Sequence, residues 1–437
     1  MTTIAFLSLF FGLIRGPLPV ELAVNGPVAA VELLVDGKSV QTLQAPPWKT
    51  AIDFGPDLLP HEIVARALDA KGAEIARTQE WANLPHSLAK VDILLEMDKL
   101  GPPKAARVVW TNLQGQKPTA ISLVLDGLPL ALDSSGRASL PAQDLASLHV
   151  LTAEATFPSL RPVRREIAYG GEYGSEVSTE LTAVPVRTRR GDLPPLEKLT
   201  GWLTSGGKPL PVAAAEQGPK QLYVIAAPGI SQNLSLIASQ RRSRWNMADV
   251  MQLGMEDRLR FVLPFPRRFT TSGGEQSDIF DISPEIEAHH TGLLSMLVTS
   301  RTARSPEGSP MRTAEAAAVA GLEAVTENRR RAILVVLPGG AKEESRFDPA
   351  MVRRYLAALR VPLFIWSVGK PEPGSAAAAW GKVVVLKGFW DLQRAYEALR
   401  ENLDSQRILL VDGRILPQSI ALSPVAASRL ELAGSVP

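Results

Sequence analysis

Short apolar runs, each closed by a turn signal, follow one another through the first part of the chain. Residues 31–43 alternate apolar and polar positions on both sides of Asp36-Gly37, and residues 121–132 repeat this pattern around Asp126-Gly127. Alternation has the two-residue period of a half-buried strand, and Asp-Gly between two such runs is a strong hairpin signal. The pattern predicts a β-hairpin at each place.

The similarity between the two hairpins continues downstream. HEIVARALD follows the first and HVLTAEATF follows the second, and each of these stretches leads into a further strand pattern. One unit therefore recurs at a period of roughly 90 residues. Several short strands with frequent turns in each unit predict two all-β, immunoglobulin-like sandwiches, residues 17–86 and 87–190.

From about residue 220 the pattern changes to strands that alternate with helix-length segments. Such alternation predicts a mostly parallel sheet covered by helices on both faces. Asp348 and Pro349 give a helix start, with the aspartate as N-cap. The expected strands are 221–229, 257–265, 330–340, 361–369 and 381–388, and the expected helices are 231–254, 312–331, 348–360 and 390–406.

The predicted fold class is therefore multidomain: two immunoglobulin-like sandwiches followed by an α/β doubly wound, Rossmann-like domain over residues 191–437. Residues 186–220 are rich in Pro and Gly and are interpreted as a connector with a hairpin turn at SGGKPLP. Residues 407–422 are interpreted as a terminal hairpin.

The first residues form one apolar run, residues 4–14. The run is too short for a transmembrane helix, which needs about 20 residues, and it has the length of a signal-peptide core. Residues 1–16 are therefore predicted to be an export signal or an anchor near a membrane. The alternative is a buried first strand or helix, since no Lys or Arg precedes the run.

Composition narrows the functional classes. The 437 residues carry 47 Lys and Arg against 45 Asp and Glu, a balance that argues against a nucleic-acid binder. Cysteine is absent, which excludes disulfides, thiolate nucleophiles and Cys-based metal sites. A chain without cysteine fits an extracytoplasmic location, secreted, periplasmic or attached to the envelope.

Motifs for catalysis are missing. The chain has five histidines and neither a G-x-S-x-G elbow nor a Walker lysine. His289-His290 are interpreted as structural, because adjacent helical positions point in different directions. We expect no enzyme activity. Trp380 and Trp390 are candidates for a binding edge.

Several stretches beyond residue 200 together resemble a von Willebrand factor type A domain, and most closely the VWFA-related proteins of acidobacteria, in which β-sandwich modules precede that domain. The stretches are GWLTSGGKPLPV, MEDRLRFVLPF, RRRAILVVLPGG, VPLFIWSVG and FWDLQRAYEALRENLDSQRILLV. The resemblance implies a metal-ion-dependent adhesion site: an Asp-x-Ser-x-Ser loop after the first strand, a Thr before a middle helix and an Asp after a later strand. Such oxygen ligands suit Mg²⁺.

This chain departs from that ligand set. Residues without oxygen-bearing side chains stand at the ligand positions Ala226, Pro228, Ile230 and Gly339. Only Thr313 matches, so we expect no metal and no cofactor. The alternative is a metal-dependent adhesin with an atypical Mg²⁺ site, in which Glu343 or Glu344 supplies the carboxylate.

The sequence thus predicts a non-enzymatic protein–protein interaction or scaffolding protein of the bacterial envelope or exterior. The pattern defines no oligomeric state. The apolar strand-end edge suits a hydrophobic contact with a protein partner. Its expected contact residues are Ala227, Gly229, Ser231, Thr313, Pro338 and Gly340.

Overall fold

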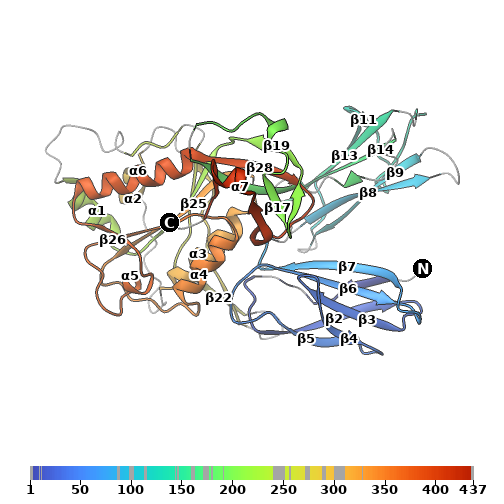
Figure 1. The fold of residues 1–437 in the computed structure, drawn as a ribbon, viewed down its shortest axis with the longest axis horizontal. Coiled ribbons are helices and arrows are strands. Elements are labelled where there is room, and N and C mark those ends of the chain that lie inside the picture. Colours follow the sequence, from blue (N-terminus) through green and yellow to red (C-terminus); the bar gives the residue numbers. More distant parts are fainter. Residues whose placement is uncertain are drawn as a thin grey trace. The chain divides into compact units, whose positions relative to one another are not determined.

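The computed structural model divides the chain into two compact units, one of Met1–Pro85, Thr182–Val411 and Ile415–Pro437, the other of His86–Leu181 and Asp412–Arg414. Figure 1 shows the elements of both units along the chain. The described residues are 3–8, 10, 12–85, 89–97, 103–112, 116–142, 144, 147–158, 163–170, 177–178, 181–189, 191–239, 251–254, 257–270, 276–287, 292–299, 311–326 and 328–434.

The first unit begins with a β-sandwich. Its core side chains, among them Val31, Leu33 and Ile63, are fully buried between two sheets. One sheet has the order β1 (Thr3–Phe6), β2 (Pro17–Asn25) and β5 (Lys49–Asp53); the other has β4 (Lys38–Leu43), β3 (Ala30–Val35), β6 (His61–Leu68) and β7 (Glu74–Ala82). The β3–β4 hairpin turns at Asp36 and Gly37, whose φ angles of 51° and 76° suit the tight hairpin turn that Asp-Gly predicts.

The apolar N-terminal run is part of this sandwich. Strand β1 pairs with β2, and Ile4, Phe10 and Ile14 are buried in the core. Asn83 fixes the end of the run: its side-chain oxygen accepts from Ile14 N at 2.6 Å and its amide donates to Ile14 O at 2.8 Å. The structure therefore corresponds to the alternative of a buried first strand, and the first sandwich spans residues 3–85 instead of 17–86.

The second unit is also a β-sandwich. Its core includes Val108, Leu123 and Leu151, and Trp110 packs edge-on against Phe157 with ring centroids 5.8 Å apart. One sheet has the order β12 (Arg137–Ser139), β9 (Pro103–Asn112) and β8 (Ala89–Met97); the other has β11 (Leu128–Leu130), β10 (Ala120–Leu125), β13 (Leu148–Thr156), β14 (Val163–Gly170) and β15 (Val177–Ser178).

The two sandwiches share the same set of Asp–His hydrogen bonds at the repeated hairpin. Asp36 accepts from His61 Nδ1 at 2.7 Å, and Asp126 accepts from His149 Nδ1 at 2.7 Å. Each aspartate also accepts the backbone N–H that follows its histidine, at 2.9 Å and 2.8 Å. The internal repeat read from the sequence therefore has a matching set of contacts, which anchors each hairpin to the neighbouring strand.

The α/β part of the first unit contains a six-stranded sheet in the order β24-β21-β20-β25-β26-β27. Only β24 is antiparallel to its neighbour. Strand β25 is an almost continuous apolar run, typical of a strand buried on both faces. The strand bounds are β20 (Lys220–Ala226), β21 (Arg258–Phe261), β24 (Ile286–Glu287), β25 (Arg330–Pro338), β26 (Leu363–Val368) and β27 (Val384–Leu386).

Helices cover both faces of this sheet, as Figure 1 shows. The helices α1 (Ile230–Ser239), α2 (Leu293–Thr299) and α6 (Phe389–Ser405) bury apolar side chains against one face, and α3 (Thr313–Ala324), α4 (Pro349–Ala358) and α5 (Ala376–Ala379) do so against the other. Asp348 caps α4 by accepting from Ala350 N at 2.6 Å, which confirms the predicted helix start. The strand–helix alternation of the sequence is thus present in the observed layers.

The first sandwich joins the core of the α3–α4 face. Leu58 is fully buried within that core. The Tyr355 hydroxyl of α4 donates to Asn83 O at 3.0 Å, and Arg354 pairs with Asp57 at 2.5 Å. These contacts belong to one compact unit of the chain.

Residues 181–216 and 406–432 form a further β-sandwich, so the expected connector and terminal hairpin are parts of one module. Its core joins Val184, Trp202 and Leu203 to Leu409 and Ile420. One sheet has the order β19 (Val212–Glu216), β28 (Gln406–Asp412), β16 (Leu181–Thr188) and β30 (Leu430–Leu432); the other has β18 (Lys208–Leu210), β17 (Leu203–Ser205) and β29 (Ile420–Leu422). The short helices η2 (Leu196–Leu199), η4 (Pro417–Ser419) and α7 (Pro424–Ala427) connect these strands.

Other expectations need correction. Helix α1 begins at Ile230 and is described to Ser239. Of the remainder of the expected helix, residues 240–250 are outside the described residues, and residues 251–254 are not helical. The hairpin of β22 (Arg267–Thr270) and β23 (Gln276–Ile279) was not expected. Among the helices of the described residues, none combines the length and the hydropathy needed to cross a membrane.

We expect Phe10→Ala to lower the free energy of unfolding of the N-terminal sandwich by about 3–5 kcal/mol. The Phe10 ring lies 5.4 Å from Phe6 and 6.3 Å from Phe54, so its loss leaves a cavity. Leu7→Ala is the control, since Leu7 is 56% exposed. Urea unfolding followed by Trp fluorescence measures both; equal effects would contradict the packing of the N-terminal run.

We expect Asp126→Asn to lower the pKa of His149. The hydrogen bond between them raises the pKa of His149 above 6.5 and lowers that of Asp126 below 3.8. Their contribution to stability, up to about 1 kcal/mol, is therefore present between these values. It is lost as pH rises through the raised His149 pKa or falls through the lowered Asp126 pKa. NMR titration of the histidines measures the shift, with Asp133→Asn as the unaffected control.

Candidate functional site

The predicted binding edge lies between β20 and β25. From this point β21 and β24, which follow β20 in the sequence, lie on one side of the sheet, and β26 and β27, which follow β25, lie on the other. Strands β20 and β25 are central neighbours, and the chain leaves them toward opposite faces of the sheet. In open α/β sheets the crevice at the carboxyl ends of such strands is the usual ligand site. Ala227 N donates to Val336 O at 3.0 Å, which holds the two strand ends together.

Burial divides the predicted residues of this edge into two groups. Ala226, Ala227, Ile230, Thr313 and Gly339 are buried, whereas Pro228, Gly229, Ser231, Pro338 and Gly340 are at least partly accessible. Two expected contact residues, Ala227 and Thr313, therefore lie too deep to touch a partner. Both residues pack beneath the edge. Ala227 follows the central strand β20, and Thr313 begins helix α3, which covers the central strands.

The backbone at Gly339 leaves no room for a side chain. A Cβ atom built there would lie 2.3 Å from the carbonyl oxygen of Lys370. Glu372 N donates to Gly339 O at 2.9 Å, which holds the two loops at this spacing. An aspartate at this position would require the Lys370 backbone to move, so the carboxylate implied by the resemblance is excluded by packing as well as by sequence.

The Thr313 hydroxyl is already bonded. It donates to the Glu343 carboxylate, and Trp380 Nε1 approaches the same hydroxyl oxygen at 3.3 Å. The Ser345 hydroxyl also donates to Glu343. Glu343 is therefore brought to Thr313, as the alternative reading of the sequence required, while Glu344 contributes only a backbone N–H bond to Met311 O at 2.9 Å.

This cluster caps the N-terminus of α3 from outside the helix. Ala314 N donates to Ser345 Oγ at 3.1 Å and lies 3.4 Å from Glu343 Oε1. A carboxylate near the first turn is favourable because the helix dipole places partial positive charge there. Glu343 thus accepts from three donors within the protein, two hydroxyl groups and one backbone N–H.

A buried ionic network lies beside the cluster. Arg312 pairs with Glu315 and, at 2.5 Å, with Asp278, while Arg346 Nε donates to Glu315 at 2.9 Å. Burial would raise the pKa of Glu315, but the hydrogen bonds from Arg312 and Arg346 outweigh it and leave that pKa lowered. The network fixes the β22–β23 hairpin and the loop after β25 against the start of α3.

The two tryptophan candidates differ. Trp380 is buried at 2% exposure, whereas Trp390, at the start of α6, is 73% exposed. Only Trp390 can contact a partner. His289-His290 lie outside the described residues.

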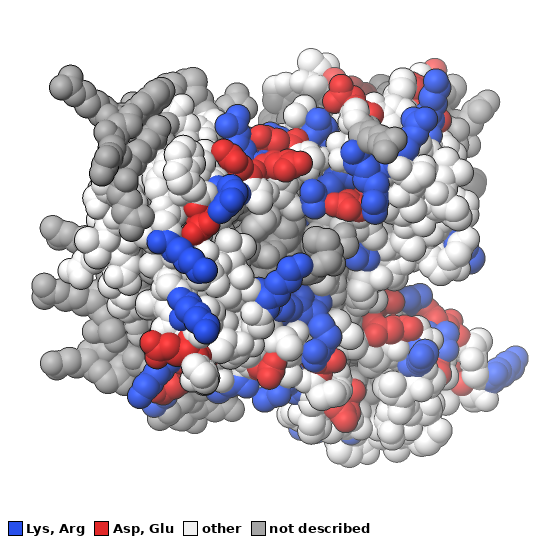
Figure 2. All heavy atoms as spheres, turned by 60° about the vertical axis from the view of Figure 1, so that its left-hand side comes forward, with Lys and Arg blue, Asp and Glu red and all other residues white. Residues whose placement is uncertain are grey.

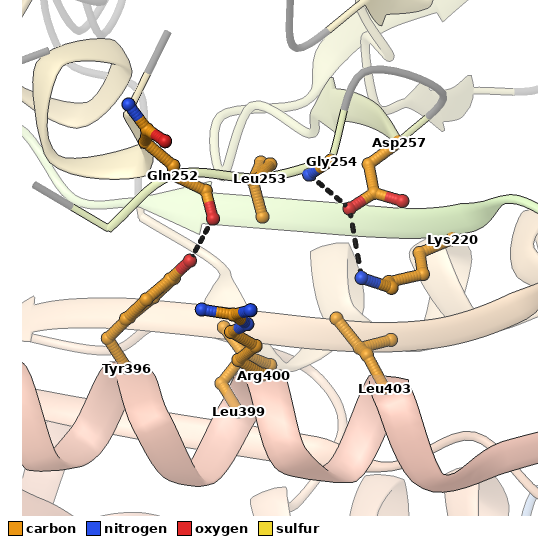
Figure 3. A pocket seen from close by; sticks show the side chains of 9 residues that line it. All are labelled: Lys220, Gln252, Leu253, Gly254, Asp257, Tyr396, Leu399, Arg400 and Leu403. Atoms are coloured by element: carbon orange, nitrogen blue, oxygen red, sulfur yellow. Dashed lines mark hydrogen bonds and ion pairs between the residues drawn. The ribbon is translucent and has the colours of Figure 1, made fainter. Parts of the chain in front are cut away.

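A second candidate site, not expected from the sequence, lies at the opposite, amino-terminal end of the strands. It is a cavity of about 270 Å³ between α6 and the starts of β20 and β21. Figure 3 shows Tyr396, Arg400 and Leu403 projecting from α6 toward residues 252–254, Asp257 and Lys220. Its lining residues come from segments far apart in the sequence, and they form no recognisable sequence motif.

Charges on the surface are mixed. In Figure 2 the Lys and Arg side chains lie among Asp and Glu side chains on the face shown. Within the described part of the chain, no group of three or more His, Cys, Asp or Glu side chains is placed to hold a metal ion. The face shown in Figure 2 therefore has mixed charge, and the described residues form no carboxylate cluster suited to a metal ion.

Comparison with known proteins gives weak structural likenesses. No family model and no curated protein matches the chain. Fibronectin(III)-like modules of Clostridium thermocellum CbhA align at 18% identity over 18% of this chain and 92% of theirs, with a TM-score of 0.17. The central fibronectin-III array of RIM-binding protein aligns at 12% identity over 42% of this chain and 73% of its own, with a TM-score of 0.21.

The human COPII-coat protein Sec24c aligns at 9% identity over 50% of this chain and 43% of its own, with a TM-score of 0.26. None of the three shares the fold of the whole chain. The description of β-sandwich modules and an α/β sheet therefore rests on strand order and core packing.

We expect Gly339→Ala to destabilise the α/β domain by about 1–3 kcal/mol, the usual effect of overpacking. Gly340→Ala is the matched control, because its Cβ would meet only the movable end of the Glu372 side chain, at 2.9 Å. Thermal unfolding of both variants measures the difference. Equal melting temperatures would show that the two loops are not held together as described.

Proposed function

We propose that the chain is a non-enzymatic binding or scaffolding protein whose α/β part is a von Willebrand A-like domain without a metal-ion-dependent adhesion site. The strand order and the antiparallel edge strand β24 support the domain assignment. The partner is a protein that contacts the strand-end edge through Pro228, Gly229 and Ser231. The absence of cysteine supports a place in the bacterial envelope or exterior.

This proposal rests on the cluster of Thr313, Glu343 and Ser345 at the strand ends, whose oxygen atoms are already hydrogen-bonded to one another. Thr313 donates to Glu343, and Gly339 has a carbonyl oxygen where a ligand side chain would have to fit. Mg²⁺ requires several oxygen ligands in near-octahedral geometry. Binding at this edge therefore depends on shape and apolar contact.

The second candidate is a metal-dependent adhesin, and one observation favours it. Thr313, Glu343 and Ser345 bring two hydroxyl groups and one carboxylate together at the end of the sheet. A cation there would have to displace the hydrogen bonds that now join these groups. The two candidates differ in whether chelators abolish partner binding.

We expect Ser231→Arg to prevent capture of the partner from an extract of cells that express the chain, and EDTA to leave capture unchanged. Ser231 lies at the start of α1, on the proposed contact edge. Ser239→Arg, at the other end of α1, is the matched control and retains capture. Quantitative mass spectrometry of the captured proteins gives the measurement.

Two results would contradict the proposal. Loss of the captured protein with EDTA, and its return with Mg²⁺, would favour the metal-dependent adhesin. Equal capture by the Ser231→Arg and Ser239→Arg variants would show that the strand-end edge is not the contact surface.

A further inference from the structure

The cavity at the amino-terminal end of the sheet has an apolar wall. Leu399 and Leu403 of α6 lie on one side, and Leu253 lies on the facing segment. Leu399 and Leu403 are almost completely buried, at 0% and 1% exposure, so the helix side of the cavity is fixed by the core. A volume of about 270 Å³ is at the lower end of ligand pockets. The cavity is suited to one short apolar group.

The polar groups at the inner end of the cavity are already paired. Lys220 lies 3.2 Å from Asp257 and 2.6 Å from Asp404. Gly254 N donates to Asp257 at 2.7 Å, and the Tyr396 hydroxyl donates to Gln252 O. Burial raises the pKa of Tyr396 to about 12, so this hydroxyl stays protonated and keeps its bond. Among the described residues, the donors of Lys220, Gly254 and Tyr396 are therefore bonded within the protein.

Of the two cationic side chains in the described lining, Arg400 has fewer partners than Lys220. Its Nε lies 3.3 Å from Asp404, and its side chain is 60% exposed. No other hydrogen bond ties its guanidinium to a described residue, and Figure 3 shows it extending from α6 into the space between Tyr396 and Leu253. Terminal guanidinium nitrogens in this state bind carboxylates through charge-assisted hydrogen bonds.

The local charge balance favours an anion. Lys220 and Arg330 are neighbours at the starts of β20 and β25, and the charges of Asp257 and Asp404 act on Arg330. Among the described residues that line the cavity, Lys220 and Arg400 are cationic and Asp257 is a carboxylate. Arg407, which also acts on Arg330, lies 3.6 Å from the exposed Asp192. The described lining therefore carries more positive than negative charge.

We propose that this cavity binds a carboxylate that carries a short apolar group. The apolar group fills the space between Leu253, Leu399 and Leu403, and the carboxylate pairs with Arg400 at the mouth. Such a ligand can be a free aliphatic carboxylic acid or the C-terminal residue of a peptide with an apolar side chain. This site is separate from the strand-end edge and is independent of its function.

Calorimetric titration of the full chain with hexanoate and with hexanamide tests the proposal. The two probes share an apolar chain and differ in charge. We expect hexanoate to bind about tenfold more tightly than hexanamide, the effect of one hydrogen bond to a charged group. N-acetyl-Gly-Leu and its C-terminal amide, titrated in parallel, distinguish the sources: tighter binding of this acid than of hexanoate indicates a peptide C-terminus, and weaker binding indicates a free acid.

Variants separate the two parts of the site. Arg400→Gln should remove the preference for the acid, whereas Arg394→Gln should keep it. Arg394 is the matched control because it lies on the same helix, is 74% exposed and also pairs with a carboxylate, Asp391. Leu253→Asn should weaken the acid and the amide alike. Absence of hexanoate binding, equal affinity for acid and amide, or an unchanged preference in Arg400→Gln would overturn the proposal.

Discussion

The burial of strand β25 on both faces is the constraint on which the α/β domain depends. Its residues from Arg330 to Leu337 are all buried. A strand of this kind has to be apolar on both sides and covered by helices on both sides, which accounts for two separate cores. The carboxyl end of β25 is also tightly packed, since Gly339 follows directly and lies against the Lys370 backbone.

The strand-end site follows from this packing. The loop after β25 turns back across the start of α3. There Glu343 accepts from the Thr313 hydroxyl, and Ser345 accepts from the backbone N–H of Ala314 and donates to Glu343. Carboxylate and hydroxyl groups are present, but each is used inside the protein. The domain therefore keeps a doubly wound sheet while the oxygen-bearing side chains at its edge are bonded to one another.

Local signals were sufficient for part of the structure. The Asp-Gly hairpins and the Asp348 cap depend on residues within a few positions of one another, and the sequence predicted them. The partnership of Trp202 with Leu409, the clamp of Asn83 on Ile14 and the cavity between Lys220 and Arg400 join distant segments. A single sequence contains no local signal for pairings between distant segments. The module of residues 181–216 and 406–432 was therefore interpreted as a connector and a hairpin.

The central claim is that protein groups occupy the strand-end site in place of a cation. Diffraction from crystals of the full chain grown with Mn²⁺, measured at a wavelength where manganese scatters anomalously, tests it most directly. We expect no anomalous peak near Thr313 and an intact hydrogen bond between Thr313 and Glu343. A peak coordinated by Thr313, Glu343 and Ser345 would contradict it.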